Sequence, residues 1–385
     1  MDYQTYLSRR VRGIKPSGIR KFFDLLEGRS DVISLGIGEP DFVTPWHIRD
    51  AGAHSLERGF THYTPNAGTT ELRVEIAKYL DRRFGLTYDP KKEILVTVGG
   101  SEAIDLTIRA VIEPGDEVLL PEPSFVCYAP LAQLTGASVV PIPTRAEDGF
   151  GLDPEAVRAA ITEKTKLLVL PFPCNPTGAI LTRDTLEKLA KIIVEHDLIV
   201  LSDEIYAELT YPGDHVSIAS LPGMAERTIV VGGFSKSYAM TGWRLGYACG
   251  PKELLGVMTL IHQYGIMSAP TTAQYAAVEA LRNGDSDIEA MRDEYNRRRL
   301  YVTRRFNELG LTCVEPQGAF YAFPNIQKSG LSSEEFCAQL LLKQGVAVIP
   351  GDAFGACGEG HVRACYASSM QDLEEAFRRI EAFLA

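Results

Sequence analysis

The sequence is short of cysteine and of positive charge. Its seven cysteines are an odd number and include no C-x-x-C pair, which argues against a disulfide framework and against a zinc site. Acidic residues outnumber basic ones, and the net charge of −11 argues against a nucleic-acid partner that binds through its phosphates. We therefore expect no structural metal, no nucleic-acid partner and a reducing compartment.

Long apolar runs are also missing. No segment approaches the roughly 18 consecutive apolar residues that a membrane-spanning helix requires. The first residues, MDYQTYLSRRVRGIKPSG, carry basic side chains but no apolar region of a secretory signal. We expect a soluble, cytoplasmic protein with no membrane partner. Its length of 385 residues corresponds to about two domains.

Short apolar runs alternate with amphipathic stretches through the middle of the chain. The expected strands are residues 94–98, 117–120, 166–170, 198–201, 228–231 and 245–249. Helices are expected at 101–112 and 183–195, and in the second the apolar residues from Leu186 to Ile193 fall on one face. This alternation predicts an α/β fold with a mostly parallel sheet covered on both faces.

The last third of the chain has a different pattern. Residues 311–365 hold short β-like pieces broken by glycine and proline, and the closing segment from Leu373 to Leu384 carries one apolar stripe. We expect a smaller α+β domain there, connected by a long helix around residues 281–309. The expected division is residues 1–45 for an N-terminal segment and lid within the small domain, 46–285 for the large domain and 286–385 for the small C-terminal domain.

Glycines and a serine follow the first expected strand. In an open α/β sheet, ligands bind at the carboxyl ends of the strands. Gly99-Gly100-Ser101 opens the helix after residues 94–98, where glycine lets the backbone approach a ligand and Ser101 can cap the helix. The segment predicts an anion site such as a phosphate seat, and the alternative is an ordinary strand–helix turn.

Polar residues follow three further strands. Asn175 lies in PFPCNPTG, Asp203 and Tyr206 lie in SDEIY, and Lys236 lies in GGFSKSYAMTGWRLGY together with Arg244. Turn formation and helix capping are the alternative uses of the asparagine and the aspartate. As a set, these residue types suit pyridoxal 5′-phosphate, because a lysine forms a Schiff base with its aldehyde and an acid pairs with its pyridine nitrogen. Burial near a cation would lower the pKa of the lysine enough for it to react.

These motifs together resemble the class I/II aminotransferases of the fold-type I pyridoxal-phosphate enzymes, in the aspartate/aromatic branch. The resemblance covers nearly the whole chain, from LGIGEPDF at residues 35–42 to Val362-Arg363. It rests on NPTG at 175–178, DEIY at 203–206 and SKSYAMTGWRLGY at 235–247, in that order. It implies a large domain with a mostly parallel seven-stranded sheet between helices, plus a smaller α+β domain.

The resemblance implies catalytic roles for Lys236, Asp203 and Tyr206, with Asn175 beside them. Lys236 would carry the internal aldimine and move the proton between substrate Cα and the cofactor. Asp203 would pair with the pyridinium nitrogen, and Tyr206 and Asn175 would hydrogen-bond the ring hydroxyl oxygen. Asn175 would also face the substrate.

A phosphate seat is implied as well. Ser101 and the N–H groups of Gly100 to Glu102 would hold the phosphate together with Ser235 and Arg244. A carboxylate beside a phosphate dianion costs energy, so we expect the Glu102 side chain to point away and only its backbone to bind.

The resemblance also implies contacts from residues outside the catalytic set and the phosphate seat. Phe125 would stack on the cofactor ring, and Tyr63 would reach the phosphate of the neighbouring subunit in an obligate homodimer with shared active sites. Arg363 would bind the substrate α-carboxylate with both nitrogens of its fork, and Gly38 would let the backbone approach the same group. Residues 16–23 are the expected lid.

One departure from the family pattern bears on the substrate. Typical aspartate aminotransferases carry an arginine for the distal carboxylate four residues before a Ser-x-Pro motif. Here Ser268-Ala-Pro270 is the counterpart, and Tyr264 stands in place of that arginine. We therefore expect an aromatic or large apolar amino donor, with aspartate possible, and a 2-oxo acid such as 2-oxoglutarate as acceptor in a ping-pong reaction.

Other activities compete with this interpretation. A β-elimination lyase acting on a sulfur amino acid would use the same lysine, aspartate, tyrosine and asparagine, so the motifs leave it open. A dinucleotide-dependent oxidoreductase is disfavoured because residues 99–104 read GGSEAI rather than G-x-G-x-x-G. A transcription regulator built on the same fold is disfavoured by the acidic charge and by the short stretch before the core.

Overall fold

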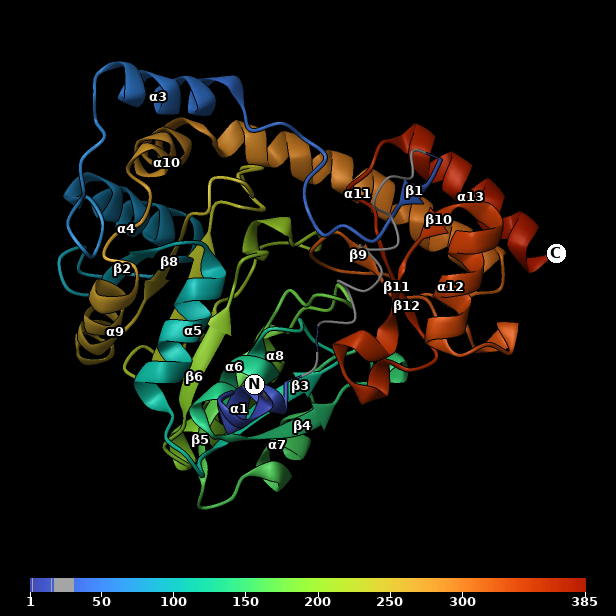
Figure 1. Ribbon diagram of the computed structural model, residues 1–385, viewed down its shortest axis with the longest axis horizontal. Helices are drawn as coiled ribbons and strands as arrows, with labels where there is room; N and C mark the ends of the chain where they lie inside the picture. The colour runs from blue at the N-terminus through green and yellow to red at the C-terminus, as the bar shows by residue number, and fades with distance from the viewer. Residues whose placement is uncertain (2, 15, 17–30) are drawn as a thin grey trace.

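The computed structural model describes residues 1, 3–14, 16 and 31–385. Figure 1 shows a large body built around a twisted sheet and, beside it, a smaller body formed by the C-terminal third of the chain. The expected lid falls outside the described residues apart from Pro16.

A seven-stranded sheet forms the centre of the large body, in the order β2-β8-β7-β6-β5-β3-β4. Its strands are β2 (Ile94–Thr97), β3 (Glu117–Glu122), β4 (Ser138–Pro143), β5 (Thr165–Leu170), β6 (Ile199–Asp203), β7 (Thr228–Gly233) and β8 (Gly246–Cys249). β8 runs antiparallel to both neighbours, and the other strands run parallel to one another. The expected mostly parallel sheet is confirmed.

Both faces of this sheet are buried. Successive residues of a strand point to opposite faces, so neighbouring apolar residues of an inner strand enter different cores. In β5, Leu168 packs into the core that contains Leu189, whereas Val169 packs into the core that contains Ile104. Inner strands buried in this way read as nearly continuous apolar runs, which is why the sequence reveals them.

Helices cover the two faces of the sheet. One face carries α5 (Gly100–Val111), α6 (Tyr128–Thr135) and α9 (Lys252–Gly265), and the other carries α4 (Thr70–Phe84), α8 (Arg183–Glu195) and α10 (Thr271–Asn283). Outside these layers, α3 (Trp46–Glu57) packs on α10, α7 (Pro154–Ala160) lies beside β4 and α1 (Arg9–Arg12) lies beside α6 (Figure 1). The expected bounds and buried face of α8 are confirmed, since Leu186, Leu189 and Ile193 are all buried.

The smaller body begins with a long helix, α11 (Asp285–Glu308). It contains a three-stranded antiparallel sheet in the order β11-β12-β9 and two further helices. These elements are β9 (Tyr321–Ala322), β11 (Ile349–Pro350), β12 (Val362–Cys365), α12 (Ser333–Gln344) and α13 (Met370–Leu384). From the start of the chain, β1 (Ile33–Ser34) pairs in parallel with β10 (Val346–Ala347), so residues before the large body complete the smaller one.

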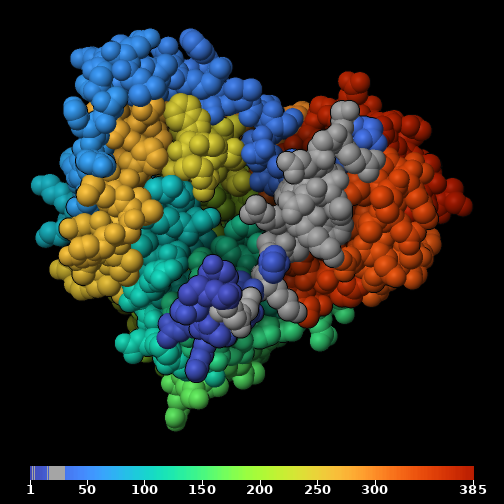
Figure 2. Space-filling model, viewed as in Figure 1, coloured from blue at the N-terminus to red at the C-terminus, as the bar shows by residue number. Residues whose placement is uncertain are grey.

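The two bodies lie side by side in the space-filling view. Figure 2 shows the smaller body on one side of the molecule, with α3, α9 and α10 on the other. The expected boundary near residue 285 falls at the start of α11, although the division into domains stays a prediction. Among the described residues, no helix combines the length and the apolarity needed to cross a bilayer.

Three details correct the expectations from sequence. β4 was not expected, because its segment SVVPIP holds two prolines and lies at the edge of the sheet. Ser101 does not cap α5, since Gly99 occupies the N-cap with no side-chain bond and Gly100 already belongs to the helix. The helical pattern over 281–309 is two helices, because α10 ends at Asn283 and α11 begins at Asp285.

Candidate active site

A cavity of about 370 Å³ opens at the carboxyl ends of the strands. Its lining residues include Gly36, Gly38, Gly100, Ser101, Phe125, Asn175, Asp203, Tyr206, Ser235, Lys236, Arg244, Tyr321 and Arg363. The structure therefore brings nearly all of the expected site residues of one chain into a single cavity. These residues lie far apart in the sequence, because they come from the ends of several strands and from the smaller body.

Lys236 follows β7 and extends across the cavity. Its Nζ donates a hydrogen bond of 2.6 Å to the carbonyl oxygen of Gly38. The nitrogen lies 5.9 Å from the ring centroid of Tyr206 and 5.7 Å from that of Phe320. Burial lowers the pKa of Lys236 to about 8, and Arg363 and Arg244 push it in the same direction. The expected poor solvation of this lysine is present in the structure.

Asp203 ends β6 at the floor of the cavity. Its Oδ2 accepts a hydrogen bond of 2.7 Å from the hydroxyl of Tyr128, and its Oδ1 accepts one of 3.2 Å from the Ile205 N–H. Burial raises the pKa of Asp203, and these two hydrogen bonds oppose the rise. A cation bound against this carboxylate would oppose it further and keep the group ionised.

Arg363 lies on β12 and extends from the smaller body into the cavity. One terminal nitrogen donates to Asn175 Oδ1 at 2.9 Å and the other donates to the Gly36 carbonyl at 2.6 Å. Its Nε is buried without a hydrogen-bond partner among the described residues. A buried guanidinium with an unused N–H donor can bind an anion that enters the cavity.

The start of α5 faces the same cavity. Gly99 at its N-cap has φ of +78°, and a side chain there would meet Arg244 Nη2 at 2.7 Å. The absence of a Cβ therefore lets the arginine lie against the helix N-terminus. Ser101 and Ser235 add hydroxyl groups to this corner of the cavity. Helix N–H groups, hydroxyls and a guanidinium together form an anion seat.

The carboxylate of Glu102 turns away from that seat, as expected. Its Oε2 accepts a hydrogen bond of 2.5 Å from the Val98 N–H, and its Oε1 lies 2.6 Å from Nδ1 of His262 on α9. Glu102 is not among the residues that line the cavity. Only its backbone remains available to an anion.

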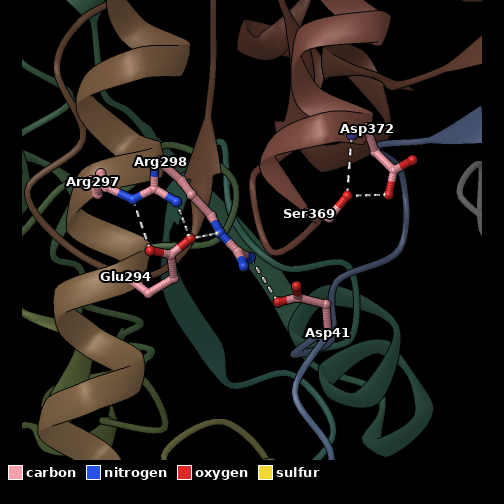
Figure 3. Close-up of polar contacts among 6 residues, drawn as sticks. All are labelled: Asp41, Glu294, Arg297, Arg298, Ser369 and Asp372. Carbon is pink, nitrogen blue, oxygen red and sulfur yellow. Dashed lines mark hydrogen bonds and ion pairs between the residues drawn. The ribbon is translucent and has the colours of Figure 1, made fainter.

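The loop that carries Gly38 is anchored by α11. Figure 3 shows Arg298 reaching from α11 to Asp41, with Nη1 to Oδ1 at 2.8 Å and Nε to Oε1 of Glu294 also at 2.8 Å. The guanidinium also lies 5.4 Å from the ring centroid of Phe42. This buried arginine therefore fixes the loop whose carbonyl accepts the hydrogen bond from Lys236.

Tyr63, an expected site residue, lies away from the cavity, and so does Tyr264, which stands in place of the distal-carboxylate arginine. Tyr63 is 82% exposed, and so is Tyr264. Neither lines the cavity within the described part of the chain. The contact expected of Tyr63 is with a neighbouring subunit, so it stays a prediction.

Sequence reasoning missed two tyrosines of the site. Tyr128 holds Asp203, and Tyr321 lies 2.7 Å, hydroxyl to hydroxyl, from Tyr206. Tyr128 is part of the PEPSFVCY segment that contains Phe125, so a sequence signal for it exists. Tyr321 belongs to the smaller body, and no pattern in the sequence links it to a strand end of the large one.

The cavity fits pyridoxal 5′-phosphate. The cavity contains an anion seat, a buried carboxylate with no cation paired to it among the described residues, and a lysine with a lowered pKa. Phe125 supplies an aromatic face in the same cavity. These groups match the phosphate, the ring nitrogen, the aldehyde and the ring of this cofactor.

Known proteins agree with this chemistry. The family model described as aminotransferase class I and II matches residues 30–380. The aspartate aminotransferase of Pyrococcus abyssi is 49% identical over 98% of this chain and 98% of its own. Aromatic-amino-acid aminotransferase 2 of Thermococcus litoralis is 46% identical over 98% of each chain. The crystal structure of the aromatic aminotransferase from Pyrococcus horikoshii has a TM-score of 0.90 and 47% identity, and the match covers 95% of this chain and 98% of that one.

The chain therefore belongs to the class I and II aminotransferases, a family of pyridoxal-phosphate-dependent enzymes that transfer amino groups. The fold-type I architecture expected from the motifs is confirmed, as is the kind of enzyme.

Proposed function

We propose that this chain binds pyridoxal 5′-phosphate in the cavity and moves an amino group from an aromatic or large apolar L-amino acid to a 2-oxo acid such as 2-oxoglutarate by a ping-pong mechanism. The observation that carries the proposal is Lys236, whose pKa is lowered to about 8, in one cavity with Asp203 and Arg363. Its neutral amine is the reactive form, and that form is accessible near neutral pH.

The cofactor would be held by groups from several elements. Ser101, Ser235, Arg244 and the N–H groups from Gly100 to Glu102 would bind the phosphate. Asp203, Asn175, Tyr206 and Phe125 would bind the ring at its nitrogen, its hydroxyl oxygen and its face. When bound, the cofactor supplies an electron sink for the negative charge that develops at the substrate Cα.

The protein would supply orientation and proton transfer. Arg363 would bind the α-carboxylate through its fork, which fixes the Cα of the amino acid beside Lys236. The Nζ of Lys236 would remove the proton from the Cα of the amino donor. In the second half of the reaction, it would return a proton to the Cα of the acceptor. Asp203 would remain ionised because it would pair with the protonated ring nitrogen of the cofactor. This pairing would keep the cofactor effective as an electron sink.

The preference for a donor without a second carboxylate rests on the charges of the cavity. Its described lining contains three cations, Lys236, Arg244 and Arg363, and each has a use in the scheme above. The same lining includes the carboxylate of Glu39, which would repel a distal carboxylate beside it, so the distal carboxylate of 2-oxoglutarate would have to point away from Glu39. Apolar lining such as Ile37 favours an apolar side chain instead. Aspartate stays possible, because relatives of both specificities match over the whole chain.

A homodimer with shared active sites is part of the proposal. Large apolar side chains are exposed around Tyr63, among them Tyr264 and Met267. The segment of Tyr63 is tied to theirs, because Asn66 donates to the Met267 carbonyl at 2.8 Å. Exposed apolar side chains gathered in one region support an interface there. There Tyr63 of the partner subunit would reach the phosphate. The domain division and the cytoplasmic location expected from the sequence stay predictions.

The absorbance spectrum of the purified protein tests the proposal. We expect a band in the range of about 360–430 nm that amino donors convert to one near about 330 nm, and that Lys236→Ala abolishes. Phenylalanine, tyrosine, leucine and aspartate are added one at a time, and the fastest conversion identifies the preferred donor. Aspartate as the fastest donor would contradict the aromatic preference. Ammonia release without conversion would indicate the lyase, and no band after addition of the cofactor would refute the proposal as a whole.

A further inference from the structure

A buried pair of tyrosines joins the two bodies of the molecule at the cavity. Tyr206 belongs to the large body and Tyr321 to β9 of the smaller one, and their hydroxyl oxygens lie 2.7 Å apart. Both side chains line the cavity and both are almost fully buried. Burial raises the pKa of each phenol, so both remain protonated over the ordinary pH range.

Tyr321 is fixed by contacts other than this hydrogen bond. The Arg363 guanidinium lies 4.6 Å from the centroid of its ring, and the ring of Tyr206 packs edge-on at 5.8 Å. Any side chain at Gly38 would collide with its hydroxyl. Among the described residues, the hydroxyl has no hydrogen-bond partner except Tyr206. Packing therefore determines the position of the Tyr321 ring, and the Tyr321 hydroxyl is left to form a hydrogen bond with Tyr206.

We propose that Tyr321 is a positioning residue that donates its proton to the Tyr206 oxygen and thereby directs the Tyr206 proton into the cavity. This inference rests on the proposed function, in which Tyr206 faces the ring hydroxyl oxygen of the cofactor. A hydroxyl has one proton to donate and two lone pairs with which to accept. If Tyr321 is the donor of the pair, Tyr206 keeps its proton for a ligand oxygen.

The consequence is a chain of two donors in a buried site. Hydrogen bonds arranged in sequence polarise one another, so a Tyr206 that accepts from Tyr321 donates more strongly. Stronger donation stabilises the deprotonated ring oxygen and lowers the pH at which the bound cofactor titrates. Among the described residues, the other titratable groups that face the pair are Lys236, Arg363 and Cys365. The hydrogen bonds of Lys236 to Gly38 and of Arg363 to Asn175 and Gly36 do not involve the Tyr321 hydroxyl.

The test is a spectral pH titration of the holoenzyme without substrate. Tyr321→Phe keeps the ring under Arg363 and removes only the hydroxyl. We expect the titration midpoint of the visible band to rise by roughly half a pH unit, because cooperative strengthening of one hydrogen bond is modest. Tyr366→Phe is the matched control, since Tyr366 is also buried but donates to the Ala319 carbonyl at 3.1 Å, outside the cavity. Its midpoint should equal that of the unmodified enzyme.

Two further variants separate positioning from packing. Tyr206→Phe should raise the midpoint more than Tyr321→Phe, and adding Tyr321→Phe to it should cause no further shift. Site-specific replacement Tyr321→3-fluorotyrosine keeps the hydroxyl, enlarges the ring by one fluorine atom only and makes the hydroxyl a stronger donor, so the midpoint should fall.

The outcomes distinguish this inference from the proposed function. An unchanged midpoint in Tyr321→Phe, or additive shifts in the double variant, would show that Tyr321 only packs. A fall in the midpoint of Tyr321→Phe would show that Tyr206 donates to Tyr321, which reverses the inference. Absence of any cofactor band from the unmodified protein would instead refute the proposed function, before the variants are compared.

Discussion

Replacing Lys236 by methionine should stabilise the cofactor-free protein at neutral pH. Burial lowers the pKa of this lysine from 10.5 to about 8, so the protonated amine destabilises the folded state. At about 1.36 kcal/mol per pH unit, the shift corresponds to about 3 kcal/mol of folding free energy. We reduce this to about 2 kcal/mol because the amine is open to the cavity and water screens it there. Loss of its hydrogen bond to the Gly38 carbonyl costs about 1 kcal/mol, which leaves a net gain of about 1 kcal/mol.

The pH dependence of this difference is the sharper test. Below about pH 8 the lysine is protonated in both the folded and the unfolded state, and the full penalty applies. Between about pH 8 and the unfolded value of 10.5, the folded protein has released the proton and the unfolded chain still binds it, so stability rises with pH. The methionine variant has no such rise. Its advantage at neutral pH should therefore shrink or reverse near about pH 10.

Urea unfolding of both cofactor-free proteins, at neutral pH and near about pH 10, measures the two differences. Comparing the variant with the unmodified protein at each pH cancels the titration of all other groups. A difference in the free energy of unfolding that stays constant with pH would refute the reasoning, because it would mean that the fold does not oppose the charge of Lys236.

Three further substitutions test other parts of the site and the fold. Arg363→Lys loses the fork for the α-carboxylate, so the KM of the amino donor should rise by about tenfold or more while the cofactor spectrum stays the same; an unchanged KM places the carboxylate elsewhere. Glu208→Gln breaks the buried pair with Arg83 at 2.5 Å and should lower the free energy of unfolding by about 3 kcal/mol in urea, whereas a loss of a few tenths would mean that the pair is solvated. Glu102→Gln weakens the link from α5 to His262 and should reduce cofactor affinity by about tenfold in equilibrium dialysis; equal affinity would mean that the helix needs no such link.

Much of the large body follows from local sequence patterns. The strands of the inner sheet are recognisable because both of their faces are buried, and α8 is recognisable because its apolar residues recur with helical spacing. β4 escapes the same reasoning, because it is a half-exposed edge strand with two prolines. Residues at strand ends, such as Asn175 and Asp203, could be found because parallel strands deliver their ends to one edge of the sheet.

The part of the site that comes from the smaller body could not be found in this way. Arg363 meets Asn175 across 188 positions of the chain, and Tyr321 meets Tyr206 across 115. No periodicity encodes such contacts, since they depend on how the smaller body packs against the sheet. Arg363 was identified only through a family resemblance, and Tyr321 was not identified at all.

The charges of the cavity explain why both bodies are needed. Lys236 and Asp203 come from the large body, and burial disfavours the charged form of each. Arg363 comes from the smaller body, where Tyr321 and Phe354 cover its faces at 4.6 and 4.9 Å. Its charge lowers the pKa of Lys236, whereas Cys365 of the same strand and Glu39 raise it, and burial of the amine is the largest cause of the lowered pKa. A change that separates the two bodies should therefore raise the pKa of Lys236 toward its ordinary value, besides removing the arginine that binds the carboxylate.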